Sequence, residues 1–355
     1  MMPILELNHF ALFLFGFLSV LLTCILILLS QKWHSAYSHD TDEGPQKIHL
    51  RSVPRIGGIG LLCGLFIGLF LGVPFAGNLV IGILPTFIAG ISEDISKKIT
   101  PRLRLSASIA SAILLVWLLS LQLSANGIPF LYPLFSIPIF SMVITILSIA
   151  LMAQSMNIID GLNGLSIGSS LIMTAAIGSI AYMHGDIALA QFSLFFFACL
   201  AGIYVINFPR GLLFVGDGGA YLMGSVIGVL AILLAERNSS ISSFASLLIV
   251  SYPIYETLRS FIRRTIDKNS DFSIADDQHF HSIIYRYIVK SRLLSRFNSE
   301  KLWIPNALSG ISCCLLPVLS SCFAILFQTS MPALLICLVI IIVLYEGIVK
   351  ILAKA

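Results

Sequence analysis

The chain has 355 residues, of which 57% are hydrophobic and only 11% are charged. A soluble domain carries roughly 25% charged residues, so this composition excludes a soluble globular protein and indicates an integral membrane protein. The net charge of +4 comes from loops on one membrane face, and we expect no nucleic-acid partner. The seven cysteines lie in apolar runs without metal-ligand spacing, so we interpret them as small buried hydrophobic residues.

The apolar runs predict an all-α, polytopic fold with ten or eleven transmembrane helices, because a bilayer-spanning helix needs about 20 apolar residues. The first run is too long for the apolar part of a signal peptide and has no basic segment before it, so we expect a span there. The third predicted span is short and contains Pro85. The predicted spans are 9–31, 56–74, 77–91, 104–124, 133–154, 163–183, 187–206, 218–236, 241–263, 303–325 and 332–351.

The distribution of lysine and arginine predicts the orientation. With eleven spans, only Arg237 of the 21 Lys and Arg residues falls on the side of the N-terminus. The positive-inside rule therefore predicts an outside N-terminus and a cytoplasmic active face. The middles of the spans are almost free of ionisable groups, which a transporter would place there, so we expect one membrane-enzyme domain over 1–355. Its cytoplasmic loops are 32–55, 92–103, 155–162, 207–217 and 264–302.

A polar segment at 154–165 separates two long apolar runs. Asn157, Asp160 and Asn163 recur at a spacing of three, so in a helical turn they would share one face. Gly161 and the glycine that follows Asn163 permit close backbone approach or positive φ. The alternative interpretation is a simple turn between two membrane helices.

Two loops carry acidic residues next to membrane helices. Glu93 and Asp94 are adjacent carboxylates at a helix end, where they could bind Mg²⁺ or act as a base; a solvated loop of mixed charge is the alternative. Asp217 lies among three glycines directly before a span. A carboxylate beside bare amides at a helix start suits a metal–phosphate site, and capping of that helix is the alternative.

Two further loops carry basic residues. Lys47 and Arg55 lie in a loop that ends in glycines and runs into a helix, which could grip phosphate through side chains and backbone N–H groups. The alternative is flanking charge. His279 and His281 alternate, so on an extended segment they would share a face. They could bind pyrophosphate or be surface residues, and we do not expect a zinc site.

Taken together, these segments resemble the polyprenyl-phosphate N-acetylhexosamine-1-phosphate transferase superfamily, glycosyltransferase family 4. The resemblance runs in order across most of the chain. The Pro-Arg-Ile-Gly-Gly sequence and the single histidine loop are more similar to the N-acetylglucosamine branch than to the muramoyl-pentapeptide branch. The matching segments are 53–58, 93–94, 157–164, 207–219 and 279–281.

The chain departs from the family pattern at three positions. Glu93 stands where the family usually has Asp, Gln154 where it commonly has Asn, and Ala220 where Ser is frequent. These differences keep the chemistry of the superfamily and leave the sugar preference open.

The resemblance implies transfer of N-acetylhexosamine-1-phosphate, with N-acetylglucosamine favoured, from a UDP-sugar to undecaprenyl phosphate, with release of UMP. This would be the first membrane step of an O-antigen or lipopolysaccharide type of polysaccharide, in the bacterial inner membrane. Phospho-N-acetylmuramoyl-pentapeptide transfer and lipid-linked sugar transport are the alternatives, and a homodimer is left open.

The resemblance also implies roles for individual residues. Asp217 would bind Mg²⁺ or Mn²⁺, and Asp94, with Glu93 beside it, would deprotonate or position the lipid phosphate. The residues implied to bind substrate are Lys47, Arg55, Asn157, Asp160, Asn163, His279 and His281.

Overall fold

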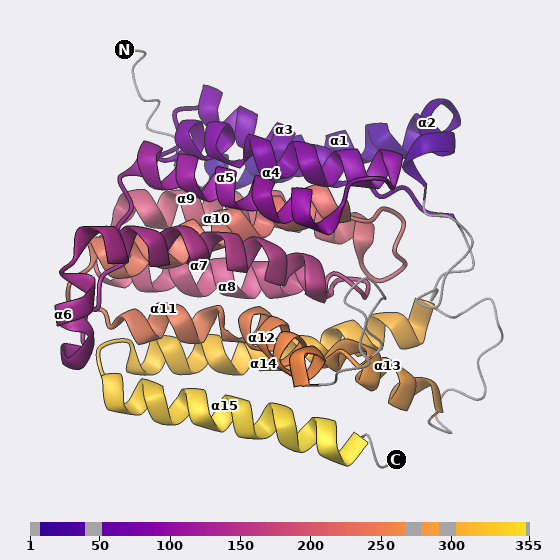
Figure 1. Ribbon diagram of the computed structural model, residues 1–355. Coiled ribbons are helices and arrows are strands. Elements are labelled where there is room, and N and C mark those ends of the chain that lie inside the picture. The colour runs from indigo at the N-terminus through magenta and orange to yellow at the C-terminus, as the bar shows by residue number, and fades with distance from the viewer. Residues whose placement is uncertain (1–7, 40–51, 267–277, 291–302, 353–355) are drawn as a thin grey trace.

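The computed structural model describes residues 8–39, 52–266, 278–290 and 303–352. Across these residues the protein is helical, with nine helices long and apolar enough to span a membrane and one shorter apolar helix. The long helices lie side by side in one bundle (Figure 1), which confirms the predicted fold class. The helices are α1 His9–Leu29, α2 Gln31–Ser38, α3 Gly58–Phe70, α4 Ala76–Ser96, α5 Pro101–Leu119, η1 Pro129–Leu131, α6 Tyr132–Phe135, α7 Pro138–Ile159, α8 Leu165–Met183, α9 Ile187–Asn207, α10 Gly216–Arg237, α11 Ser243–Ile249, α12 Ser251–Ile266, α13 Phe280–Lys290, α14 Trp303–Phe327 and α15 Met331–Leu352.

The third predicted span is longer than expected. It was predicted over 77–91, but α4 is 21 residues long and continues past Pro85 to Ser96. A proline inside a helix disturbs the local hydrogen bonding. Here the Thr86 N–H donates to the Ser111 hydroxyl at 2.9 Å, and the hydroxyls of Thr86 and Ser108 lie 3.0 Å apart. Side chains of α5 therefore replace the bonding that the α4 backbone loses.

The ninth predicted span, 241–263, is divided at Val250 into α11 and α12. Pro253 lies in the first turn of α12. Proline is tolerated there because a first-turn residue needs no intrahelical N–H bond, whereas in a continuous helix it would remove one. The proline therefore favours a new helix start in place of a single straight span.

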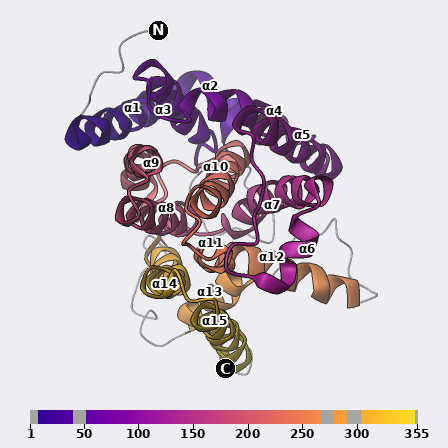
Figure 2. The ribbon, with the colours of Figure 1, turned by 90° about the vertical axis from the view of Figure 1, so that its left-hand side faces the viewer.

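α10 is the centre of the bundle. It packs against α3, α4, α5, α7, α8, α9 and α11. The part of α10 long enough to span a membrane is 100% buried, compared with 28% of the corresponding part of α1 and of α15. Figure 2, which views the bundle from one end, shows α10 enclosed by its neighbours. A helix that is apolar all round belongs in such an interior.

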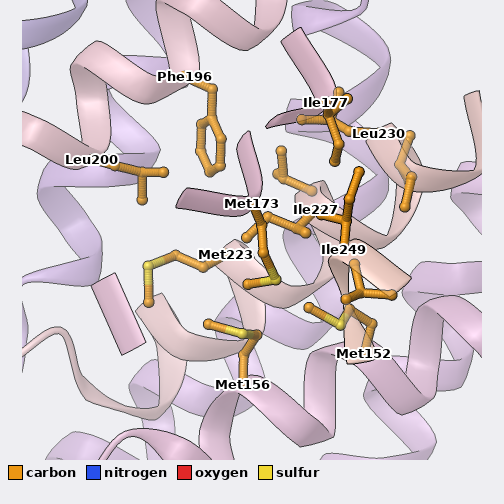
Figure 3. Packing of buried hydrophobic residues seen from close by; sticks show 14 of the residues in the cluster. Met152, Met156, Met173, Ile177, Phe196, Leu200, Met223, Ile227, Leu230 and Ile249 are labelled. Carbon is orange, nitrogen blue, oxygen red and sulfur yellow. The ribbon is translucent and has the colours of Figure 1, made fainter. Parts of the chain in front are cut away.

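Long, flexible side chains fill the space around α10. Met152 and Met156 of α7 meet Met173 of α8 and Met223 of α10 in one buried cluster (Figure 3). Methionine fits irregular gaps between helices because its chain is unbranched. This packing fixes α10 against α7 and α8.

The loops gather at two ends of the bundle, as the predicted alternation requires. At one end Arg237 donates two hydrogen bonds to Asp186, at 2.7 and 2.9 Å, and His184 lies 3.2 Å from Gln328. At the other end lie α2 and α13 (Figure 1), together with the sites described below. The assignment of that second end to the cytoplasm stays a prediction from the positive-inside rule.

Candidate active site

Backbone hydrogen bonds join the segment before α3 to the segment before α10. The N–H of Phe214 donates to Pro54 O, the N–H of Gly57 donates to Phe214 O, and the N–H of Gly58 donates to Val215 O, each at 2.9 Å. The intervening Arg55 is thereby held beside the first turn of α10. This pairing is the reason why residues 160 positions apart can share one site.

The glycines of this segment serve packing. A Cβ atom added at Gly58 would lie 2.5 Å from the backbone nitrogen of Gly219, so only glycine lets α3 begin this close to α10. From the sequence, the backbone N–H groups of the 53–58 loop were candidates to grip phosphate. For Gly57 and Gly58 this is wrong, because their N–H groups donate to protein carbonyls.

Asp94 caps α10 from a different helix. It lies in the last turn of α4, is only 3% exposed, and accepts the N–H groups of Asp217 at 2.9 Å and Gly218 at 3.0 Å. The expectation of bare amides here is therefore wrong. So is the capping alternative for Asp217, because the N-cap position Val215 has no side-chain bond and Asp94 supplies the acceptor. An anion at this position is favoured by the helix dipole.

Two arginines hold the carboxylate of Asp217. Arg55 Nη2 lies 3.2 Å from Asp217 Oδ1, and Arg104 Nη1 pairs with Asp217 Oδ2. Arg55 Nε is also 3.7 Å from Asp94 Oδ1. We call these four residues the Asp94–Asp217 cluster. Its acids are buried while the Arg55 side chain is 34% exposed, so an incoming anion would meet the guanidinium groups first.

Glu93 points in another direction from its neighbour Asp94. Its Oε2 accepts the N–H of Ile99 at 2.7 Å, and its backbone oxygen accepts the N–H of Lys97 at 2.8 Å. Lys97 has a left-handed φ of 56°. Glu93 therefore closes the turn between α4 and α5, whereas Asp94 serves α10.

The polar segment 154–165 does not form one helical face. α7 ends at Ile159 and Asp160 is its C-cap residue, with φ −79° and ψ 49°, so the shared face expected for its polar residues is not formed. Asp160 accepts a hydrogen bond from the Ser166 hydroxyl. Burial raises the pKa of Asp160 to about 6, against the opposing effects of Ser166 and Arg55. Asn157, in the last turn of α7, is half-buried.

Asn163 is built into the protein. It is 1% exposed, its N–H donates to Asn306 Oδ1 at 2.7 Å, and its side-chain Nδ2 donates to Pro209 O at 3.1 Å. Nearby, Asn207 Oδ1 accepts the N–H of Gly164 at 2.7 Å. These contacts fasten the polar segment to the loop before α10 and to α14. Nucleotide binding by Asn163 stays a prediction, and this structural role stands beside it.

The histidine motif lies against the same segment. α13 begins at Phe280, so the extended conformation expected for the motif is not formed, yet the rings of His279 and His281 stack with centroids 5.4 Å apart. A Cβ atom added at Gly161 would lie 2.5 Å from His281 Nε2. His281 therefore lies directly against Gly161, the residue that follows Asp160, as sequence order alone could not show. Lys47 lies outside the described residues.

Two residues of this end were not predicted as individual site residues. Arg104 was included only among the basic residues after Glu93 and Asp94 that could hold phosphate or lipid headgroups, and Glu256 was noted only as an acid near the end of a predicted span. Both are ionisable residues whose side chains lie largely inside the helix bundle, where a charge is costly unless it is paired. That cost was the available signal, since Arg104 pairs with Asp217 and Glu256 pairs with His279.

The cluster offers hard oxygen ligands of the kind that Mg²⁺ prefers. Among the described residues there is no group of three or more His, Cys, Asp or Glu side chains suited to hold a metal alone. Mg²⁺ usually needs only one or two carboxylates together with substrate phosphates, and each carboxylate oxygen can accept more than one partner. Asp217 and Asp94 therefore fit such an ion when a phosphate substrate is present.

The chain is similar in sequence to known transferases. Residues 77–235, from α4 to the end of α10, match the family described as Glycosyl transferase family 4. A Bacillus subtilis protein described as a probable undecaprenyl-phosphate N-acetylglucosaminyl 1-phosphate transferase is 26% identical over 70% of each chain. Undecaprenyl-phosphate alpha-N-acetylglucosaminyl 1-phosphate transferases are 26% identical in Thermotoga maritima (78% of this chain, 82% of that one) and 27% identical in Escherichia coli K12 (70% and 69%).

Proposed function

We propose that this chain is a member of glycosyl transferase family 4, whose model it matches over residues 77–235, and that it transfers N-acetylglucosamine 1-phosphate from a UDP-sugar to undecaprenyl phosphate and releases UMP. The names of its relatives support this acceptor and this sugar. The observation that carries the proposal is the Asp94–Asp217 cluster, which places paired acids and arginines at one end of a multi-pass bundle. We further propose that this end faces the cytoplasm of a bacterial inner membrane and that the product starts a cell-surface polysaccharide.

The arginines account for phosphate binding. Transfer of a phosphoryl group needs positioning and neutralisation of charge more than covalent chemistry. Arg55 and Arg104 both pair with Asp217. The acid therefore fixes the positions of the two guanidinium groups, which can donate hydrogen bonds to a phosphate. Fork-shaped guanidinium groups suit phosphate oxygens.

Asp217 and Asp94 would hold Mg²⁺, which supplies further neutralisation of the diphosphate when bound. Asp94 also keeps the first turn of α10 in place through the N–H groups of Asp217 and Gly218. In this proposal Asp94 positions or deprotonates the lipid phosphate, Asp160 and Asn157 hold the nucleotide, and the stacked His279 and His281 contact the diphosphate.

The reaction can be tested with the purified protein in detergent or nanodiscs. Undecaprenyl phosphate would be incubated with UDP-N-acetylglucosamine, UDP-N-acetylgalactosamine or UDP-N-acetylmuramoyl-pentapeptide, with and without Mg²⁺. We expect UMP and a lipid-diphosphate product with the first sugar. UMP only with the pentapeptide substrate would favour the muramoyl-pentapeptide alternative, and no UMP with any donor would overturn the proposed transfer.

A further inference from the structure

Glu256 is a buried acid that links three helices next to the histidine motif. It lies on α12, is 1% exposed, and faces three hydrogen-bond donors. His279 Nδ1 is 2.8 Å from its Oε1, the N–H of Phe280 donates at 3.2 Å, and the Tyr345 hydroxyl donates to Oε2. The donors come from the start of α13 and from α15, so one side chain joins both to α12.

The contacts of Glu256 determine the state of the His279 ring. An ionised carboxylate only accepts hydrogen bonds, and three donors surround this one. With Glu256 ionised, His279 Nδ1 carries the proton of this hydrogen bond, and the bond fixes the orientation of the ring. A carboxylate that orients a histidine in this way controls what the rest of the ring can do in many functional sites.

The oriented His279 ring is connected to the candidate site through His281. His279 stacks on His281 with an interplanar angle of 10°, and His281 lies against Gly161, next to Asp160. Phe280, between the two histidines, is held by its N–H bond to Glu256 and by stacking on Tyr345 with centroids 4.7 Å apart. Glu256 thus sets the position of both histidines and lies behind them.

We propose that Glu256 is a positioning residue that acts through His279 to hold the stacked histidines where the diphosphate of the UDP-sugar binds. The proposal rests on the proposed function for the identity of the ligand. It assigns Glu256 no contact with substrate. Its loss should therefore weaken binding of the sugar nucleotide and leave the lipid acceptor unaffected.

Glutamine at this position tests the idea because it keeps the volume and changes the hydrogen bonding. An amide has one oxygen, its NH₂ group only donates, and it carries no charge, so in Glu256→Gln the hydrogen bond to the His279 ring loses its charge assistance and one of the two Oε positions can no longer accept. We expect KM for UDP-N-acetylglucosamine to rise about tenfold, the low end for an orienting partner. KM for undecaprenyl phosphate should change less than about twofold.

A double-mutant cycle separates positioning from general damage. If Glu256 acts through His279, then Glu256→Gln should add little in a His279→Ala background, because the coupled effects of contacting residues are not additive. Full multiplication of the two effects would overturn the proposal. Tyr345→Phe, which removes one donor and keeps the ring, should give a smaller rise in KM and serves if Glu256→Gln does not fold.

The chain provides a matched control on the same helix pair. Glu346 accepts hydrogen bonds from Tyr255 at 3.0 Å and from Arg259 at 2.7 Å, between α12 and α15. Glu346→Gln removes a charge of the same kind, and neither of these two hydrogen bonds involves His279. We expect it to leave KM for the nucleotide unchanged, and an equal rise in both variants would point to a general loosening of α15.

A spectroscopic readout keeps this test independent of the reaction. In protein labelled with ¹⁵N-histidine, the His279 ring should show a protonated Nδ1 in the wild type and an altered Nδ1 signal in Glu256→Gln. An unchanged signal would overturn the positioning role. If the wild-type protein transfers no sugar phosphate, the proposed function fails, while this measurement still decides whether Glu256 orients His279.

Discussion

Asp94 and Asp217 lie on different helices, yet the carboxylate of Asp94 accepts the backbone N–H of Asp217 at 2.9 Å. The two acids therefore have unequal surroundings. Asp94 is bound to the start of α10, where backbone N–H groups favour its charge, whereas Asp217 faces two guanidinium groups. This inequality leads to different expectations for their substitution.

Asp217→Asn should lower kcat by at least about 10²-fold, because the change removes the proposed metal ligand and leaves Arg55 and Arg104 without their shared acid. The measurement is UMP release over a range of Mg²⁺ concentrations. Asp186→Asn is the matched control, since it removes an acid from Arg237 at the opposite end of the bundle. Near-wild-type kcat in Asp217→Asn would refute the metal assignment.

Asp94→Asn should also lower kcat by at least about 10²-fold, the low end for lost acid–base catalysis. Glu93→Asp and Glu93→Gln should cost less than that, because Glu93 bonds Ile99 in the turn after α4 and does not reach α10. Initial rates at saturating substrates check both. A large loss in Glu93→Gln with little in Asp94→Asn would show that the roles are reversed.

Asp160→Asn should raise stability while it lowers activity. The folded protein raises the pKa of Asp160 from 3.8 to about 6, so the folded state binds a proton more tightly than the unfolded state. The contribution of protonated Asp160 to the free energy of unfolding is fully present below about pH 4 and is lost as the pH rises through 6. Asparagine has no charge to bury, so the variant should gain at most roughly 3 kcal/mol at pH 7.5.

Thermal melting in detergent at several pH values checks this expectation. The difference in melting temperature between Asp160→Asn and the wild type should grow from pH 4 to pH 7.5. A difference that is constant across this range would mean that the charge of Asp160 is not the cause.

Gly90→Ala should destabilise the protein by about 1–3 kcal/mol, as overpacking typically does. A Cβ atom at Gly90 would lie 2.5 Å from the backbone of Gly218, which would push α4 away from α10. Gly347→Ala in α15 is the matched control, since a Cβ atom there meets nothing within 4 Å. It should be neutral or slightly stabilising. Equal melting temperatures for both variants would contradict the close contact of α4 and α10.

The orientation can be tested by labelling single cysteines in a cysteine-free background. A membrane-impermeant maleimide added to intact cells should label Ser239→Cys and not Lys98→Cys, because both positions are exposed but lie at opposite ends of the bundle. Lysed cells should label both and serve as the control. Labelling of Lys98→Cys in intact cells would reverse the predicted topology and move the candidate site to the outer face.

The helices were largely predictable because each span is a long apolar run, and the sorting of loops followed from charge. The exceptions involve prolines. Pro85 suggested a short span, and the hydroxyls of Ser108 and Ser111 that allow a longer one lie on another helix. A local pattern cannot reveal a partner of that kind.

The residues of the site were also predictable by type, but their partners were not. The sequence indicated that Asp94, Asp217 and the nearby glycines matter. It could not indicate that Asp94 would use the amides of α10, because the two are more than 120 positions apart. The same holds for Asn163, whose amide could bind a nucleotide or a carbonyl equally well, and in the folded chain it binds Pro209 O.

The central position of α10 has a consequence for how the protein is made. Of the helices that pack closely against it, α3, α4, α5, α7, α8 and α9 precede it in the chain and only α11 follows. Synthesis proceeds from the N-terminus. Six of the helices that pack against α10 are therefore translated before α10 itself. A nascent chain that has reached residue 240 already contains both acids and both arginines of the Asp94–Asp217 cluster, whereas Glu256, His279 and Tyr345 are still to be translated.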